Sequence, residues 1–155
     1  MSFVYLGLGS NLGNKQANLK RAISALDERV GNLVKCSSFY RTLPEGFVSE
    51  KMFLNAVAVF ETTLPPEDVL LQTEQIEKEL GRIKKSIDKI YTDRCIDIDI
   101  LFYDDIILHT ESLIIPHPLL HQRRFVLEPL KEIAPHLVHP ILKEDVVSLC
   151  EHLTK

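Results

Sequence analysis

Two aspartates lie two residues apart within an apolar run, in the segment Arg94-Cys-Ile-Asp97-Ile-Asp99-Ile-Leu. Because side chains alternate across a β-strand, a strand here would place Asp97 and Asp99 on one face and the isoleucines on the other. Their Cα atoms would then lie roughly 6 to 7 Å apart, from a rise of about 3.3 Å per residue. Carboxylates at this spacing can bind one divalent cation together or bridge two cations about 4 Å apart.

A half-exposed strand with an ordinary polar face would show the same alternation. Aspartate, however, is disfavoured in strands, and two parallel carboxylates repel each other unless a cation lies between them. We therefore interpret the pair as a metal site. Oxygen ligands favour Mg²⁺ or Mn²⁺ over Zn²⁺.

Cationic side chains flank the aspartates and are suited to phosphate groups, whose transfer is catalysed mainly by positioning and charge stabilisation. They are Arg82, Lys84, Lys85, Lys89 and Arg94 before the pair, and His117, Arg123 and Arg124 after it. Each lysine taken alone fits a solvated loop, whereas Arg94 adjoins the aspartate strand. The chain has no Walker A sequence, and the spacing of Gly7, Gly9 and Gly13 does not match G-x-G-x-x-G. Any ATP site here would therefore lack a P-loop.

Hydrophobic periodicity predicts the elements that must position these residues. We expect strands at 3–8, 34–41, 54–62 and 95–103, a helix ending at Gly31, and a helix opening at Pro65 and ending at Gly81. A short strand near 106–108 and one or two helices between 123 and 153 would follow. This order is the ferredoxin-like βαββαβ plan of an α+β protein, with helices on one face of an antiparallel sheet and C-terminal helical additions.

Bulk composition predicts a single globular domain over residues 1–155, with 45% hydrophobic and 26% charged residues. A net charge of −4 argues against a duplex nucleic-acid binder. The apolar runs are too short to span a bilayer, so no membrane partner is expected. Three widely separated cysteines favour a reduced, cytoplasmic protein over a disulfide framework or a zinc site.

Seven segments in a characteristic order resemble one family. They are Leu8-Gly-Ser-Asn-Leu12, Ser38-Phe-Tyr-Arg-Thr42, Phe53-Leu-Asn-Ala56, Glu77 with Gly81-Arg82, Arg94 to Asp99, Ile115-Pro-His-Pro118, and Arg123 with Phe125. Together they resemble the 6-hydroxymethyl-7,8-dihydropterin pyrophosphokinase family. The resemblance implies transfer of diphosphate from ATP to the pterin alcohol in folate biosynthesis. It also implies two Mg²⁺ ions held by Asp97 and Asp99, with the pterin hydroxyl attacking the β-phosphorus and AMP leaving.

The resemblance further implies roles for individual side chains. Catalytic residues would be Arg82, Arg94, Asp97 and Asp99, and ATP contacts would come from Glu77, Arg82, Arg94, Ile100, His117 and Arg123. Pterin contacts would come from Thr42, Leu43, Phe53, Asn55, Asp97 and Phe125, with the ring stacked between the two phenylalanines. Asn55 would read the hydrogen-bonding edge of the ring. The loops at 44–52 and 82–93 resemble mobile lids.

Several alternatives stay open at this point. Either Asp97 takes the proton of the hydroxyl, or metal coordination lowers the pKa of the hydroxyl enough. Another metal-dependent phosphate enzyme would use the same aspartates without needing Phe53, Phe125 and Asn55. A ferredoxin-like regulatory module would leave the aspartates unexplained. We expect a monomer whose only partners are ATP and the pterin.

Overall fold

The structure is a computed structural model that describes residues 1–42, 52–81 and 95–153. The predictions for Leu43, Arg82 and Arg94, and nearly all of both predicted lids, lie outside the described residues. In the part of the chain that is described, no helix combines the length and apolar character required for a membrane span.

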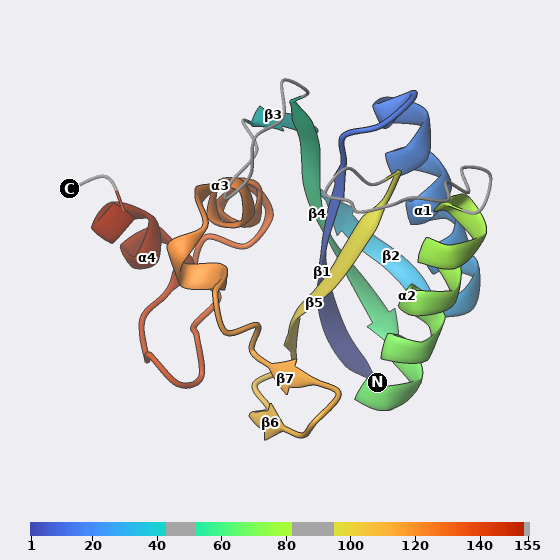
Figure 1. Cartoon of the computed structure of the whole chain (residues 1–155). Helices are drawn as coiled ribbons and strands as arrows, with labels where there is room; N and C mark the ends of the chain where they lie inside the picture. Colours follow the sequence, from blue (N-terminus) through green and yellow to red (C-terminus); the bar gives the residue numbers. More distant parts are fainter. Residues whose placement is uncertain (43–51, 82–94, 154–155) are drawn as a thin grey trace.

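An antiparallel sheet forms the centre of the molecule (Figure 1). Strand β1 (Ser2–Ser10) pairs with β4 (Phe53–Thr62) on one side and with β5 (Asp97–Tyr103) on the other. Strands β2 (Gly31–Cys36) and β3 (Tyr40–Thr42) both pair with β4. The resulting order, β2-β4-β1-β5, confirms the predicted ferredoxin-like α+β class.

Helices cover both faces of this sheet: the two helices of the βαββαβ plan share one face, as predicted, and the C-terminal additions, for which no face was predicted, cover the other. Helices α1 (Lys15–Arg29) and α2 (Pro66–Gly81) lie on one side, and α3 (Arg124–Ile133) and α4 (Val146–Leu153) lie on the other (Figure 1). The reason is that the central strands are apolar on both faces. Leu6 and Phe60 pack in the core under α1 and α2, whereas Val57, Leu101 and Phe102 pack in the core under α3 and α4.

The turn after β1 is built from polar side chains that also begin α1. Gly13 has a φ of +67°, a conformation that glycine adopts without the strain that a side chain would bring. Asn14 is the N-cap of the helix, and its side-chain oxygen accepts from the Ala17 N–H at 3.1 Å. Asn18 donates to Ser10 Oγ at 3.2 Å and to the Leu12 carbonyl at 2.9 Å, which ties the helix back to the strand.

A small hairpin separates the sheet from the C-terminal helices. It comprises β6 (Leu108–His109) and β7 (Ile114–Ile115), and a 3-10 turn at Leu120–Gln122 follows. The Ile115–Pro116 peptide bond is cis, and the next backbone N–H, that of His117, donates to the Leu101 carbonyl at 3.0 Å. The predicted strand near 106–108 thus begins at Leu108, and the chain leaves the hairpin alongside β5.

Gly31 is required by a close backbone approach. Helix α1 ends at Arg29 with Val30 as its C-cap, so Gly31 already begins β2 rather than ending the helix as predicted. A Cβ at Gly31 would lie 2.1 Å from the Glu61 carbonyl oxygen on β4. Only glycine therefore lets β2 pair with β4 directly after the helix.

Gly31→Ala should destabilise the fold by about 3 kcal/mol, because the added methyl group meets backbone that has little freedom to move. Urea unfolding measures this change. Gly81→Ala is the matched control, since a Cβ at the end of α2 meets no atom of the described residues within 4 Å. It should leave stability unchanged or raise it by up to about 1 kcal/mol. Equal unfolding midpoints for the two variants would contradict the steric argument.

Candidate active site

Strand β5 places its two aspartates on the face of the sheet that carries α3. Ile98 and Ile100 are 6% and 5% exposed and pack in the core under α1 and α2, whereas Asp97 and Asp99 are partly exposed. Asp99 pairs with Gly7, which also pairs with Val57 of the core under α3. The predicted alternation of the aspartates with the isoleucines is therefore confirmed.

A β-bulge ends the polar stretch of this strand. The register between β1 and β5 shifts at Leu101, so that Leu6 pairs with Ile100 and Tyr5 pairs with Phe102. As a result Leu101 and Phe102, although adjacent, both pack in the core under α3 and α4. The bulge separates the carboxylates at one end of β5 from a fully apolar segment at the other end.

Gly7 and Gly9 leave β1 without a side chain on this face of the sheet, and we call the position above Gly9, between β4 and β5, the slot. In the ladder, Asn55 of β4, Gly9 of β1 and Asp97 of β5 lie directly beside one another, so their side chains share a face. Since neighbouring strands are about 4.8 Å apart, the Cα atoms of Asn55 and Asp97 are separated by roughly 10 Å, and β1 contributes no side chain between them. A Cβ at Gly9 would lie 2.8 Å from Asn55 Oδ1 and 3.7 Å from Phe53 Cδ1. Gly7 and Gly9 fit no nucleotide-binding motif, and of the two only Gly9 lies in a segment that resembles the family.

Asn55 forms one wall of the slot and is held in a fixed orientation. Its side chain is 5% exposed, and its Nδ2 donates to Thr42 Oγ1 at 2.6 Å. Thr42 in turn pairs with Phe53, which lies on the same face two residues before Asn55. The structure thus brings together three of the residues predicted to contact the pterin.

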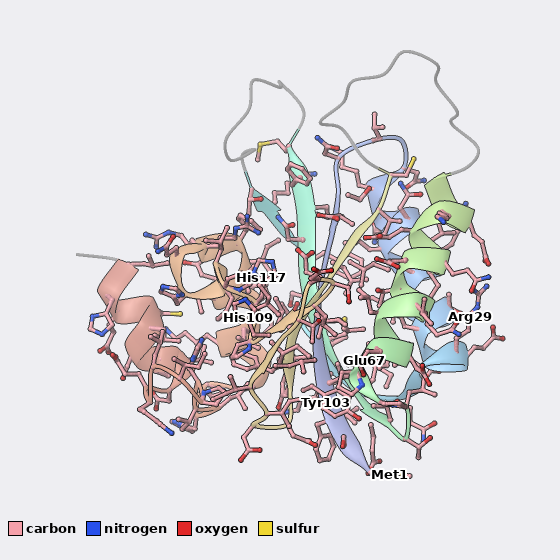
Figure 2. All side chains as sticks on the ribbon, turned by 60° about the horizontal axis from the view of Figure 1, so that its bottom comes forward. Met1, Arg29, Glu67, Tyr103, His109 and His117 are labelled. Carbon is pink, nitrogen blue, oxygen red and sulfur yellow. The ribbon has the colours of Figure 1, made fainter. Side chains whose placement is uncertain are left out.

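His117, Arg123 and Phe125 lie on the α3 side of the same region. In Figure 2, His117 lies beside the sheet, on the opposite side from Arg29 of α1. Burial and the nearby Arg123 charge lower the pKa of His117, and the Asp97 carboxylate acts in the opposite direction. The Arg123 guanidinium lies over the Phe125 ring, 5.5 Å from its centroid. Through these charge interactions, His117 links Asp97 on the sheet with Arg123 at the start of α3.

Glu77 lies at the outer edge of β5. Its Oε2 accepts from the Ile98 N–H at 2.7 Å, so α2 binds the backbone of the residue between the two aspartates. Because backbone groups alternate along a strand, the N–H and C=O of Ile100 face this same edge, while its side chain is in the core. Glu77 and Ile100 are both predicted nucleotide contacts. The bond from Glu77 to Ile98 has no counterpart among the predictions from sequence.

A pocket of about 290 Å³ adjoins this edge of the sheet. It lies between β5 and the β6–β7 hairpin and is lined by Leu70, Ile98, Asp99, Ile100, Glu111, Ser112, Leu113, Ile114, His117 and Pro118. The pocket therefore runs along the edge of β5, from Ile98 and Ile100 to Asp99 and His117.

The carboxylate oxygens of Asp97 and Asp99 suit a hard cation that also binds ligands from outside the protein. Within residues 1–42, 52–81 and 95–153, no group of three or more His, Cys, Asp or Glu side chains is placed to hold a metal ion. A cation at Asp97 and Asp99 would therefore complete its shell with ligands of another kind. Mg²⁺ binds in this way, through one or two carboxylates, water and substrate phosphates.

The fold is that of a ferredoxin-like α+β protein whose outer strand β5 carries two aspartates on one face. A family model described as 7,8-dihydro-6-hydroxymethylpterin-pyrophosphokinase (HPPK) matches residues 5–135. This chain belongs to that family.

Relatives of known name support this assignment. A 2-amino-4-hydroxy-6-hydroxymethyldihydropteridine pyrophosphokinase of Porphyromonas gingivalis is 48% identical over 141 residues, which is 90% of this chain and 95% of that protein. The folic acid synthesis protein fol1 of Pneumocystis carinii is 44% identical over 97% of this chain, which spans 20% of that protein. The crystal structure of wild-type Plasmodium falciparum HPPK-DHPS has the same fold, with a TM-score of 0.76 and 18% identity. It matches 97% of this chain, which spans 44% of that chain.

Glu77→Ala should destabilise the protein by about 1 to 2 kcal/mol, because it leaves the part-buried Ile98 N–H without its acceptor. The amide hydrogen of Ile98 should also exchange faster with solvent, as measured by NMR. Glu77→Gln is the control, since it keeps an acceptor oxygen of the same reach and should lose less than half as much. Unchanged exchange at Ile98 in Glu77→Ala would show that the bond does not hold the strand edge.

Proposed function

We propose that this chain transfers diphosphate from ATP to 6-hydroxymethyl-7,8-dihydropterin, giving AMP and the pterin diphosphate, in folate biosynthesis. The observation that supports it most strongly is the alignment of Asn55, Gly9 and Asp97 across three strands. This row sets an amide and a carboxylate on opposite sides of an open slot. The pyrophosphokinase relatives support the same reaction, since one is 48% identical and is covered over 95% of its length.

The pterin ring binds in the slot above Gly9. Phe53 and Phe125 stack on its two faces, because a flat heteroaromatic ring gains most from parallel aromatic contacts. Asn55, held by Thr42, presents its amide to the donor and acceptor edge of the ring. Leu43 completes the pocket through its backbone. The hydroxymethyl group then points along the row towards Asp97.

ATP binds from the other side, along the edge of β5. Its base enters the pocket beside the hairpin, where Ile100 offers backbone groups and Glu77 lies next to Ile98. The phosphate tail passes Asp99 and meets His117 and Arg123. Arg82 and Arg94 contribute further positive charge against the phosphates. Arginine suits this role because its planar fork matches phosphate oxygens.

Asp97 and Asp99 hold two Mg²⁺ ions together with the phosphates. Such ions neutralise phosphate charge and lower the pKa of a bound hydroxyl. The residues of the chain align the reactants: Asn55 and the two phenylalanines fix the ring, while His117 and Arg123 fix the phosphate tail. Holding the hydroxyl oxygen in line with the β-phosphorus removes much of the entropic cost of a two-substrate reaction.

We also propose a domain organisation, an oligomeric state and a compartment for this enzyme. Residues 1–155 act as one pyrophosphokinase domain and as a monomer. Cys36, Cys95 and Cys150 are all free thiols, which suits a reducing compartment such as the cytoplasm.

Asp97→Asn and Asp99→Asn should each lower turnover by at least about a hundredfold, because an amide is a poor ligand for Mg²⁺ and leaves phosphate charge unbalanced. The assay is AMP release from ATP with and without the pterin alcohol, in Mg²⁺ and in EDTA. Asp105→Asn is the control, since Asp105 is an exposed carboxylate just beyond the same strand. It should retain full activity.

The same assay separates the rival functions. A metal-dependent hydrolase would release phosphate or AMP without pterin, and a regulatory module would bind a ligand without turnover. Release of ADP in place of AMP, or equal AMP with and without the pterin, would exclude the proposed reaction.

Gly9→Ala should raise the KM for the pterin roughly tenfold or more while leaving the KM for ATP nearly unchanged. The new methyl group would lie 2.8 Å from Asn55 Oδ1 and would turn the amide that reads the ring. Gly7→Ala is the comparison, because a Cβ there makes an ordinary contact of 3.4 Å with Leu101. Steady-state kinetics with each substrate varied in turn measure the difference. Equal pterin KM values in the two variants would contradict the slot model.

A further inference from the structure

Glu132, near the C-terminal end of α3, makes a dense set of hydrogen bonds to the segment that leads into β3. The backbone N–H of Ser38 donates to both carboxylate oxygens, at 2.9 and 3.1 Å. The Ser38 hydroxyl donates at 3.0 Å and the Tyr40 hydroxyl at 2.8 Å. One carboxylate thus accepts from three donors on a stretch of only three residues. Ser38, Tyr40 and Glu132 are not among the predicted site residues.

Both ends of this contact lead to the pterin slot. Tyr40 pairs with Asn55, and Thr42, two residues further along β3, accepts the bond from the Asn55 amide. At the other end, Glu132 follows Phe125 by seven residues, or about two turns of helix, so the two side chains share one face of α3 about 10 Å apart. The carboxylate therefore ties the helix that carries Phe125 to the strand that orients Asn55.

Strand β3 needs such a tie because it is short and is paired with β4 over three residues only. Apolar packing of Leu127 and Leu130 holds α3 on the sheet, but contacts of this kind carry little directional information. Hydrogen bonds to Ser38 and Tyr40 are directional, and they fix how far along the sheet the helix sits.

The protonation states support the contact. The Glu132 bond raises the pKa of Tyr40 to about 12, so the phenol is a proton donor at neutral pH. Slight desolvation of the carboxylate acts against ionisation, but the bonds from Ser38 and Tyr40 outweigh it and lower the pKa of Glu132. An ionised carboxylate accepts from all three donors, whereas an amide in its place has only one acceptor oxygen.

We propose that Glu132 is a positioning residue for the pterin site: it sets the separation of Phe125 from Phe53 and the orientation of Asn55 through Ser38 and Tyr40. This inference rests on the proposed function. It adds a residue outside the substrate pocket, on the wall of a separate pocket of about 580 Å³ between β3 and the C-terminal helices.

Glu132→Gln and Tyr40→Phe test this role in steady-state kinetics with the full chain. Each should raise the KM for the pterin roughly fivefold and leave the KM for ATP within about twofold. The rise is modest because the carboxylate is exposed, so that water replaces part of the lost bonding. The double variant should be no worse than about the poorer single variant, because both changes break the same contact. Glu128→Gln, one turn earlier on α3, is the matched control: Glu128 pairs with Arg124, and its charge acts on Tyr40 only weakly and through space. It should match the wild type.

A second measurement separates this inference from the proposed function. The side-chain amide resonance of Asn55 should shift in Glu132→Gln and in Tyr40→Phe but not in Glu128→Gln, whether or not the chain turns over. Parallel increases in both KM values, or an unmoved Asn55 resonance in Glu132→Gln, would overturn the positioning role. Absence of AMP release by the wild type would instead refute the proposed function, and the resonance shift would still decide the inference.

Discussion

The antiparallel pairing of β1 with β4 and β5 is the constraint on which the rest of the site depends. It sets Asn55, Gly9 and Asp97 in one row and Val57, Gly7 and Asp99 in the next. Because side chains alternate, a slip of one residue in β5 would turn both carboxylates into the core under α1 and α2. The apolar burial of Ile98 and Ile100 opposes such a slip, so the same packing that stabilises the sheet also holds the aspartates outside it.

The two faces of β5 and its open edge serve three different purposes. One face carries isoleucines into the core, and the other carries carboxylates towards the slot. The edge exposes backbone groups that a ligand or a side chain must satisfy. Glu77 satisfies the one at Ile98, and the pocket beside the hairpin leaves room for a second molecule at Ile100. In the proposed function, this division lets one short strand contact two substrates, each from its own side.

Helix α3 joins the C-terminal part of the chain to the chemistry on the sheet. Its first turn carries Phe125 under the guanidinium of Arg123, its middle packs on Val57 and Leu101, and its last turn carries Glu132. A helix that lay against the sheet through apolar contacts alone would be free to shift by small amounts. The hydrogen bonds from Ser38 and Tyr40 to Glu132 restrict that freedom at the end of the helix. In the proposed site, they help to fix the distance between the two stacking phenylalanines.

Much of this protein could be predicted from local pattern. Period-two alternation around Asp97 and Asp99 identified the strand and its two faces, and proline and glycine marked the limits of α2. The order of short motifs identified the family, because such motifs record residue types at set spacings. Boundaries were less certain: the single strand predicted over 34–41 is divided between β2 and β3.

By itself, the sequence determined which residues carry the charges, the aromatic rings and the amide, and which strand bears the aspartates. Only the tertiary structure decided that Gly9 lies between Asn55 and Asp97, that α3 and α4 cover the second face, and that Glu132 reaches Ser38 and Tyr40. The physical reason is distance along the chain. Ladder register and helix docking arise from contacts between residues tens of positions apart, whereas periodicity reports only how each residue relates to its close neighbours.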